Sequence, residues 1–251
     1  MKLKKLMIGL FTGLAVTLTA MFGKFHHTHS LAENTVTETD QVTYSGNSIV
    51  DALEPMATYE SDNATAGTIL GVLNDGAGQN YGPYSLTENY TMHDFLVYLS
   101  EKYPEFYARL QSPINSDDFN ANWQQIGSEI GSENESKFKQ AQAEFIFNKT
   151  IVPAITKLKT DTGVDLIDGT HSIGAVGMFA SLIHNGGYLW YNQIKLAADE
   201  LNQTHDDNKF IEAIGGYVRD NYSGNYAHGI KNRYTKQVLY EQKRTKLFKN
   251  N

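Results

Sequence analysis

Cysteine is absent from this chain of 251 residues. Its absence excludes disulfides, zinc–thiolate centres, iron–sulfur clusters and cysteine nucleophiles. Proline is scarce, with five residues, whereas tyrosine is abundant, with 15. A chain of this length buries a sizeable core, so an exported domain of this size does not need disulfides. The sequence also lacks a Walker loop, a dinucleotide fingerprint and a Gly-x-Ser-x-Gly elbow.

The first 32 residues have the pattern of an export signal. Lys2, Lys4 and Lys5 precede an uncharged apolar run at residues 6–22. Ser30 and Ala32 then supply the small side chains that a signal peptidase requires. An uncleaved membrane anchor is the alternative, because the apolar run approaches the length that spans a bilayer.

We therefore expect a signal peptide or anchor at residues 1–32, a polar linker at 33–46 and one domain at 47–251. The expected location is secreted and cell-wall associated, or membrane-anchored on the outside of the cell. Contact with a membrane is expected only through the N-terminal segment, if that segment stays attached.

Charge is distributed unevenly. The formal net charge is −7, and it becomes −11 without the four lysines of residues 1–32. An acidic body repels nucleic acid, so no nucleic-acid partner is expected, and it attracts cationic polymers. Residues 231–251 are basic, with seven Lys or Arg against one acid. This tail either contacts anionic wall polymers or forms a solvated helix.

Hydrophobic spacing predicts the fold class. Apolar residues recur at helical spacing from Asn47 to the neighbourhood of Glu60. Two short apolar runs at 68–73 and 81–86 flank a turn-forming segment at 74–78, which predicts a β-hairpin. Helical patterns follow almost to the C-terminus. The sequence therefore predicts a mainly α (α+β) domain with one small β-hairpin.

One acidic residue precedes this hairpin, and another lies in its turn. Glu60 lies at the end of the predicted helix, and Asp75 lies in an Asn-Asp-Gly turn. Taken singly, each is typical of a solvated or turn position. A glycosidase, however, needs two carboxyl groups across a sugar bond, one held protonated in a half-apolar setting and one ionised. Tyr59 would supply the apolar neighbour of Glu60.

The stretch at residues 58–84 resembles the opening of the chitosanase-like glycosidase domains of the lysozyme-like superfamily, which occur in bacterial and phage cell-wall hydrolases. Tyr59-Glu60-Ser61 resembles the family's helix end. Residues that fall in register with its glycine-rich hairpin are Thr68, Ile69, Asp75, Gly78, Tyr81, Gly82 and Tyr84. Later matches are Phe138, Ala141, Gln142, Phe145 and Ile146 on one helix and residues 181–186, with His184, on another. The chain departs from the family's pattern at Ser85 and Asn185.

This resemblance implies a two-lobed, lysozyme-like helical domain and an inverting hydrolase that needs no metal or cofactor. It implies that Glu60 is the general acid and that Asp75 is the base that activates water. The expected substrate is a β-1,4-linked amino-sugar polymer, with peptidoglycan ranked before chitosan. The substrate-binding positions that the resemblance implies, or that lie next to its motifs, are Tyr59, Asn80, Tyr81, Tyr84, Gln142 and His184. The three tyrosines either stack on sugar rings or pack in the core.

Two other classes stay open at this point. One is a catalytically inactive module that binds cell-wall carbohydrate on the same scaffold. The other is a secreted interaction or immunity-type protein in which Glu60 and Asp75 are incidental. A further aromatic group, Trp190 with Tyr188 and Tyr191, is either a sugar subsite or part of the core.

Overall fold

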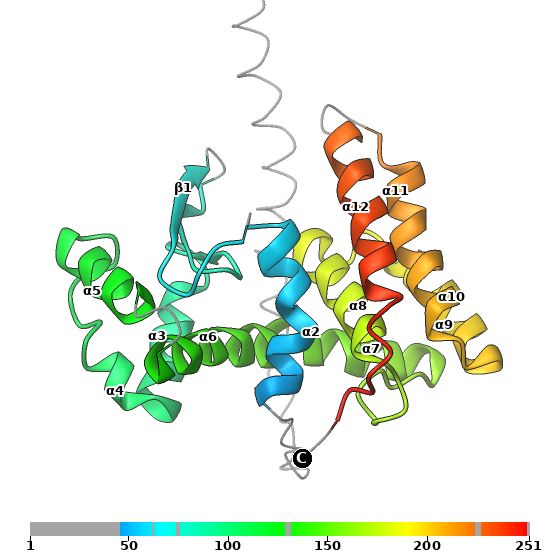
Figure 1. The fold of residues 1–251 in the computed structure, drawn as a ribbon, viewed down its shortest axis with the longest axis horizontal. Coiled ribbons are helices and arrows are strands. Elements are labelled where there is room, and N and C mark those ends of the chain that lie inside the picture. Colours follow the sequence, from blue (N-terminus) through cyan, green and yellow to red (C-terminus); the bar gives the residue numbers. More distant parts are fainter. Residues whose placement is uncertain (1–45, 62, 74–75, 129–131, 224–226, 250–251) are drawn as a thin grey trace, which may run out of the picture.

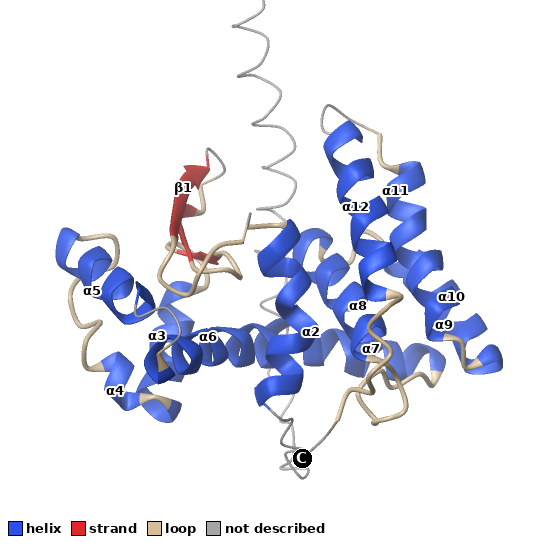
Figure 2. Ribbon diagram, in the orientation of Figure 1, coloured by secondary structure: helices blue, strands red, loops and turns tan. Residues whose placement is uncertain are grey.

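The computed structural model describes residues 46–61, 63–73, 76–128, 132–223 and 227–249. Within these residues the protein is a mainly helical domain with one small antiparallel sheet (Figures 1 and 2). The predicted fold class, mainly α with a small β element, is confirmed. The predicted export segment lies outside the described residues. In the part that is described, none of the helices combines the length and apolar character needed to cross a membrane.

Eleven α-helices and two π-helical turns account for most of the described chain. The α-helices are α2 (Gly46–Tyr59), α3 (Met92–Lys102), α4 (Pro104–Tyr107), α5 (Asp117–Ser128), α6 (Glu133–Ile146), α7 (Val152–Thr162), α8 (Ile173–Gly186), α9 (Tyr191–Thr204), α10 (Asp207–Ile211), α11 (Tyr217–Asn221) and α12 (Ala227–Glu241). The π-helical turns are η1 (Phe147–Ile151) and η2 (Glu212–Gly216), and the strands are β1 (Ile69–Leu73), β2 (Gly78–Tyr81) and β3 (Leu86–Thr87).

The sheet has the order β1-β2-β3, with both pairs antiparallel. Ile69 lies opposite Tyr81, and Tyr81 lies opposite Leu86. The run at 81–86, expected to form one strand, is instead divided between β2 and β3. Gly82 has a φ of +69°, a left-handed conformation that suits glycine, and it reverses the chain between the two strands. The hairpin therefore gains a short third strand.

Helix caps explain where two of the longer helices begin. Ser132 accepts a hydrogen bond from the backbone N–H of Glu135 at the start of α6, and Ser172 accepts one from Ala175 at the start of α8. These side chains satisfy backbone donors that have no partner inside the helix. At the C-terminal end of α7, Gly163 adopts a φ of +82° and ends the helix in a left-handed cap.

The helices form two groups around α2 and α6. Figure 1 shows α6 running beneath α2, with β1, α3, α4 and α5 on one side of α2 and α8 to α12 on the other. In the first group, Trp123 is fully buried among aromatic rings; its centroid lies 4.8 Å from Phe138 and 5.2 Å from Tyr81. In the second group, α8 is buried along nearly its whole length. The buried side chains of both groups join in one continuous core.

A backbone contact fixes the loop after α2 against α5. A Cβ atom placed on Gly127 of α5 would lie 2.0 Å from the backbone nitrogen of Gly67. One placed on Gly67 would lie 2.9 Å from Gly127 Cα. Two glycines therefore allow this loop to pass directly over the helix on its way into β1.

We predict that Gly127→Ala destabilises the domain. Alanine normally stabilises a helical position relative to glycine by up to about 1 kcal/mol. Here its methyl group meets backbone atoms that cannot move aside easily, and overpacking of this kind costs about 1–3 kcal/mol. Urea denaturation should show a lower free energy of unfolding.

Gly229→Ala in α12 is the matched control, because no atom lies within 4 Å of the added Cβ there. This variant should be as stable as the wild type or slightly more stable. If both variants had equal stability, the close contact between Gly67 and Gly127 would be disproved.

Candidate functional site

Glu60 lies directly after α2, and three segments of the chain meet at its side chain. Its backbone N–H donates to the carbonyl of Met56 at 3.0 Å, which continues the helical pattern by one residue. The side chain is only 8% exposed. Its Oε1 atom accepts hydrogen bonds from Ser181 Oγ of α8 at 2.7 Å and from Arg233 Nη2 of α12 at 2.6 Å.

Each of these three side chains contacts the other two, because Arg233 Nη2 also donates to Ser181 Oγ at 3.1 Å. Removing a carboxylate and a guanidinium from water costs several kcal/mol for each ion, and their pairing and hydrogen bonds have to offset this cost. Both of the hydrogen bonds that Glu60 accepts from α8 and α12 fall on Oε1, and none to Oε2 is found among the described residues. The carboxyl group is therefore fixed through one oxygen only.

The residue after Glu60 ties this helix end to the sheet. Ser61 is buried and its hydroxyl donates to the carbonyl of Pro83 at 2.8 Å, in the turn between β2 and β3. Asn63 then adopts a φ of +61° and donates its N–H to the carbonyl of Ala57. Glu60 is thus held at the junction between the β element and the helical group that contains α8 and α12.

A stripe of polar side chains continues from this site along α12. Gln237 and Glu241 follow Arg233 at spacings of four residues, and both are fully buried. Arg244 Nη1 donates to Glu241 Oε2 at 2.8 Å, and its Nη2 donates to the backbone carbonyl of Asp51 in α2. Glu241 Oε1 has no hydrogen-bond partner in the described part of the chain. The helix that supplies Arg233 is therefore packed partly through polar groups.

Burial controls the ionisation of Glu241. It raises the pKa of this carboxyl group from 4.5 to about 8, and the nearby Arg244 opposes the shift without cancelling it. Burial raises the pKa because the removal of water disfavours the charged form of the carboxyl group. Gly177 of α8 provides the space for this carboxyl group; a Cβ there would lie 2.7 Å from Glu241 Oε1.

Three of the predicted substrate-binding residues are core residues. Tyr81, Tyr84 and Gln142 are at most 1% exposed, so their side chains have no surface on which a ligand could lie. Tyr81 donates its hydroxyl to Asn120 Oδ1 at 2.8 Å and packs its ring against Trp123. The interpretation of these residues as ligand contacts is therefore wrong, and the alternative of core packing holds for both tyrosines.

Gln142 has a structural role instead. Its Nε2 atom donates to the carbonyl of Ala66 at 3.0 Å, in the loop that leads into β1. On its other side, a Cβ on Gly82 would lie 2.0 Å from Gln142 Oε1. Glutamine at this position thus binds the loop that leads into β1 and packs closely against the turn at Gly82, where glycine leaves room for it.

The remaining predicted contacts lie nearer to the surface or on the sheet. Tyr59 is half-buried, with its ring edge-on to Tyr240 at 6.0 Å, and burial, followed by Glu54 and Glu241, raises its pKa. Asn80 is buried in β2, where its Nδ2 lies 3.4 Å from the carbonyl of Gly71. His184 is half-buried on α8, three residues after Ser181 and on the same face of the helix.

Asp75, the second predicted catalytic residue, lies outside the described residues, between the end of β1 and the start of β2. Its proposed partnership with Glu60 stays a prediction. The structure adds two contacts with Glu60 that the sequence did not indicate, one from Arg233 and one from Ser181, which the resemblance includes only as part of residues 181–186. Ser181 and Arg233 lie 121 and 173 positions from Glu60, so spacing could not connect them to it.

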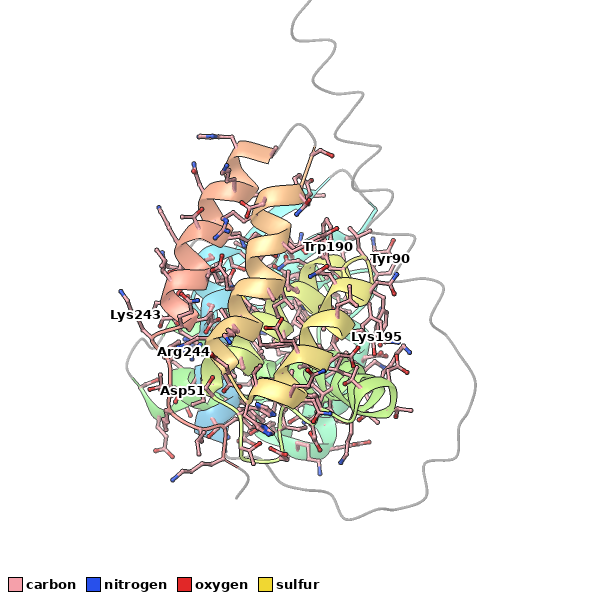
Figure 3. The ribbon with its side chains drawn as sticks, turned by 90° about the vertical axis from the view of Figure 1, so that its right-hand side faces the viewer. Asp51, Tyr90, Trp190, Lys195, Lys243 and Arg244 are labelled. Atoms are coloured by element: carbon pink, nitrogen blue, oxygen red, sulfur yellow. The ribbon has the colours of Figure 1, made fainter. Side chains whose placement is uncertain are left out.

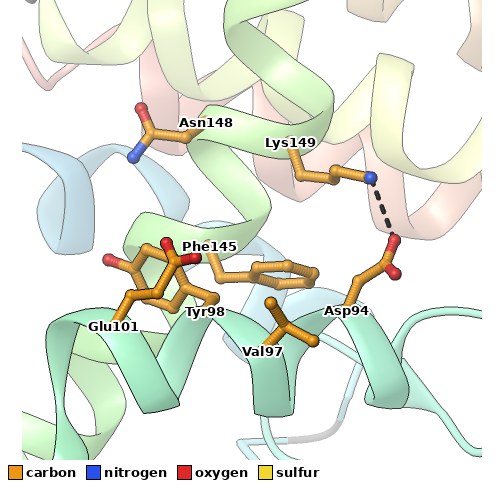
Figure 4. A pocket seen from close by; sticks show the side chains of 7 residues that line it. All are labelled: Asp94, Val97, Tyr98, Glu101, Phe145, Asn148 and Lys149. Carbon is orange, nitrogen blue, oxygen red and sulfur yellow. Dashed lines mark ion pairs between the residues drawn. The ribbon is translucent and has the colours of Figure 1, made fainter.

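A separate surface hollow lies between α3 and the segment of α6 and η1. It has a volume of about 400 Å³ and is lined by Asp94, Val97, Tyr98, Glu101, Phe145, Asn148 and Lys149 (Figure 4). Asp94 and Lys149 form an exposed ion pair of 2.9 Å at its edge. Glu60 is not part of this lining. The hollow is shallow and open, and nothing in it resembles the fixed carboxyl group of Glu60.

The fold and the site define a class: a mainly helical domain in which a small antiparallel sheet and the C-terminal helix meet at a buried Arg–Glu pair. The family described as "Type VI secretion system spike protein VgrG3-like, C-terminal" matches residues 54–246. The chain belongs to this family. A search of curated proteins finds no match.

This finding overturns the resemblance to the chitosanase-like glycosidases. That resemblance is specific only at residues 58–84 and loose after residue 150, whereas one family model matches residues 54–246. The structure gives a physical reason for the error. In this protein Tyr81, Tyr84 and Gln142 are buried in the core, and glycine at 82 leaves room for the Gln142 side chain. Their pattern indicates how a hairpin packs on a helix and does not specify a substrate.

We predict that the stability of the domain depends on pH through Glu241. Its pKa is higher in the folded than in the unfolded protein, so its contribution is fully present below about pH 4.5 and is lost as the pH rises through about 8. Between about pH 4.5 and about pH 8, the free energy of unfolding of the wild type should fall relative to that of Glu241→Gln. The fall should be at most about 1.4 kcal/mol per pH unit. Urea denaturation at several pH values measures the difference.

Glu101→Gln on the exposed face of α3 is the control, and its stability should follow that of the wild type across the same range. A constant difference between the wild type and Glu241→Gln at every pH would contradict the prediction.

Proposed function

We propose that the protein is a glycoside hydrolase that acts outside the cytoplasm on a β-1,4-linked amino-sugar polymer, with peptidoglycan ranked before chitosan. The observation that carries this proposal is the geometry of Glu60. Its carboxyl group is held at the junction of the sheet and the helices through one oxygen, and the second oxygen is uncommitted among the described residues. The family description names part of a secretion-system spike protein, which supports a site of action beyond the cytoplasm.

The proposed chemistry needs one acid and one base. Glu60 would donate a proton to the leaving glycosidic oxygen as the bond to the anomeric carbon breaks. A water molecule would attack that carbon from the opposite face and lose a proton to Asp75, which inverts the configuration. Neither step calls for a metal or a cofactor.

Arg233 constrains the acid in this scheme. Its guanidinium donates to Glu60 Oε1 at 2.6 Å, and the Ser181 hydroxyl donates to the same oxygen at 2.7 Å. The proton of a donating Glu60 therefore belongs on Oε2, because Oε1 is occupied by both Arg233 and Ser181. In this scheme Arg233 and Ser181 are positioning residues, because they fix the orientation of the Glu60 carboxyl group.

We predict that Glu60→Gln lowers the release of reducing ends from purified peptidoglycan by at least about 100-fold, since loss of a general acid costs this much or more. The variant also loses the charge that faces Arg233. Its unfolding should therefore be measured alongside its activity, so that only folded enzyme is compared. Glu60→Asp keeps the charge but withdraws the carboxyl group by one methylene, and it should be similarly inactive. Wild-type activity in Glu60→Gln would eliminate the acid role.

We predict a matching loss for Asp75→Asn. Because this change removes only the base, kcat should fall by about 100-fold or more, whereas wall binding should persist. Asp117→Asn, at the exposed start of α5, is the control and should keep full activity. Full activity in Asp75→Asn would show that another group activates the water.

A second candidate function is a non-catalytic module that binds cell-wall polysaccharide. The Glu60–Arg233 ion pair favours it, because the carboxyl group is largely buried and already engaged by a side chain of the protein itself. A wild-type protein that releases no reducing ends but sediments with peptidoglycan would fit this function. One that neither cuts nor binds would fit an interaction protein.

A further inference from the structure

The hydroxyl group of Ser181 has two possible acceptors for its single proton. Ser181 Oγ lies 2.7 Å from Glu60 Oε1 and 3.5 Å from Gln237 Oε1. Ser181 and Gln237 are both fully buried, so bulk water does not compete for this proton. A serine hydroxyl donates one hydrogen bond and accepts up to two. Its proton therefore goes either to the carboxyl group of Glu60 or to the amide of Gln237.

Distance favours Glu60 as the acceptor. Hydrogen bonds between oxygen atoms are usually about 2.5–3.0 Å long, so the contact with Glu60 is a normal bond and the contact with Gln237 is at the outer limit. Gln237 stays a competitor, however, because a rotation of the Ser181 hydroxyl about its C–O bond redirects the proton. The groups that donate to Ser181 Oγ decide how freely this rotation occurs.

Two consecutive residues of α12 donate to Ser181. Arg233 Nη2 donates to Ser181 Oγ at 3.1 Å, and the hydroxyl of Tyr234 also forms a hydrogen bond with Ser181. Burial raises the pKa of Tyr234 to about 12, so its phenol keeps its proton at neutral pH. Because the proton of Ser181 goes to Glu60, Tyr234 is the donor to Ser181. Arg233 and Tyr234 thus occupy both acceptor positions of the serine oxygen, which leaves its proton pointing at Glu60.

The ring of Tyr234 has a separate role from its hydroxyl. The guanidinium carbon of Arg233 lies 5.0 Å from the centroid of this ring, within the range of a cation–π contact. Figure 3 shows Arg244 just beyond the end of α12 and close to Asp51, whose backbone carbonyl accepts from Arg244 Nη2. The ring and this second anchor hold Arg233 and α12 without help from the phenol hydroxyl. Phenylalanine at position 234 therefore removes the hydroxyl alone.

We propose that Tyr234 is a positioning residue for Glu60, because its hydroxyl keeps the Ser181 proton on Glu60 and away from Gln237. Tyr234 is 3% exposed, so it is too deeply buried to touch a polymer and acts only through Ser181. The consequence for catalysis rests on the proposed function, in which the orientation of the Glu60 carboxyl group directs its proton. The arrangement of hydrogen bonds does not rest on it.

Carbon NMR tests the hydrogen bonds independently of hydrolysis. The protein is labelled with ¹³C at the glutamate carboxyl carbons, and the Glu60 signal is assigned by its loss in Glu60→Gln. The chemical shift of a carboxyl carbon responds to hydrogen bonds at its oxygens. In Tyr234→Phe the Ser181 hydroxyl is free to turn toward Gln237, so the Glu60 signal should move. Gln237→Leu removes the competing acceptor, and adding Tyr234→Phe to this variant should leave its Glu60 signal unchanged.

Tyr103→Phe is the matched control. Tyr103 is another buried tyrosine, and its hydroxyl donates to Glu144 Oε2 at 2.7 Å. This variant should move the signal of Glu144 and leave that of Glu60 in place. In assays of reducing ends released from purified peptidoglycan, Tyr234→Phe should lower kcat by about three- to tenfold, the effect of one hydrogen bond, at an unchanged KM. Tyr103→Phe should keep the kinetics of the wild type.

The outcomes separate this inference from the proposed function. A Glu60 signal that moves in Tyr234→Phe only when Gln237 is present supports the inference even if the wild type cuts nothing, and only hydrolysis then fails. A signal that stays in place in Tyr234→Phe, or that moves equally with and without Gln237, overturns the inference and leaves hydrolysis untouched. If the wild type cuts and Tyr234→Phe keeps its kcat, the positioning role is also overturned.

Discussion

The contact between Glu60 and Arg233 decides how the helical and β parts of this protein meet. One carboxylate oxygen accepts from α8 and from α12, and the next residue is bonded to the turn between β2 and β3. A buried carboxylate without a counter-charge would be strongly destabilising, so α12 has to be docked whenever the end of α2 is buried. The C-terminal helix is therefore part of the site, although it lies at the far end of the sequence.

The sequence was sufficient to predict what depends on local pattern. Helical periodicity up to Glu60 and the turn residues at 74–78 specify α2 and a hairpin without tertiary information. The sequence was insufficient where the role of a residue depends on contacts between segments that are distant in the chain. Tyr81 and Gln142 look like polar ligand contacts in a motif, yet tertiary packing buries them completely. Arg233 carries no local mark of its role, because an arginine at that place in a helix is ordinarily solvated.

The resemblance to the wrong family has the same cause, because the motif residues are set by tertiary packing. A glycine-rich hairpin packed on a helix requires glycine at 82, where a side chain would strike Gln142. Proteins with different substrates can share such requirements, so a motif built from them identifies an architecture more readily than an activity. The match over residues 54–246 includes the whole of α8 and α12, and Arg233 of α12, which contacts Glu60, is not among the residues that carry the resemblance. It is therefore the stronger basis for stating the family.

The distribution of buried polar groups favours Glu60 as the site over the hollow beside α3. At the hollow, Asp94 and Lys149 are both more than half exposed, and such surface pairs contribute little to stability or specificity. Along α12, by contrast, Gln237 and Glu241 are buried, and each has an atom without a hydrogen-bond partner among the residues that the structure describes. Apolar residues in their place would make this packing more stable. Natural proteins tolerate such costs mainly where function requires them. The polar packing of α12 is explained if its purpose is to carry Arg233 to Glu60 in one fixed orientation.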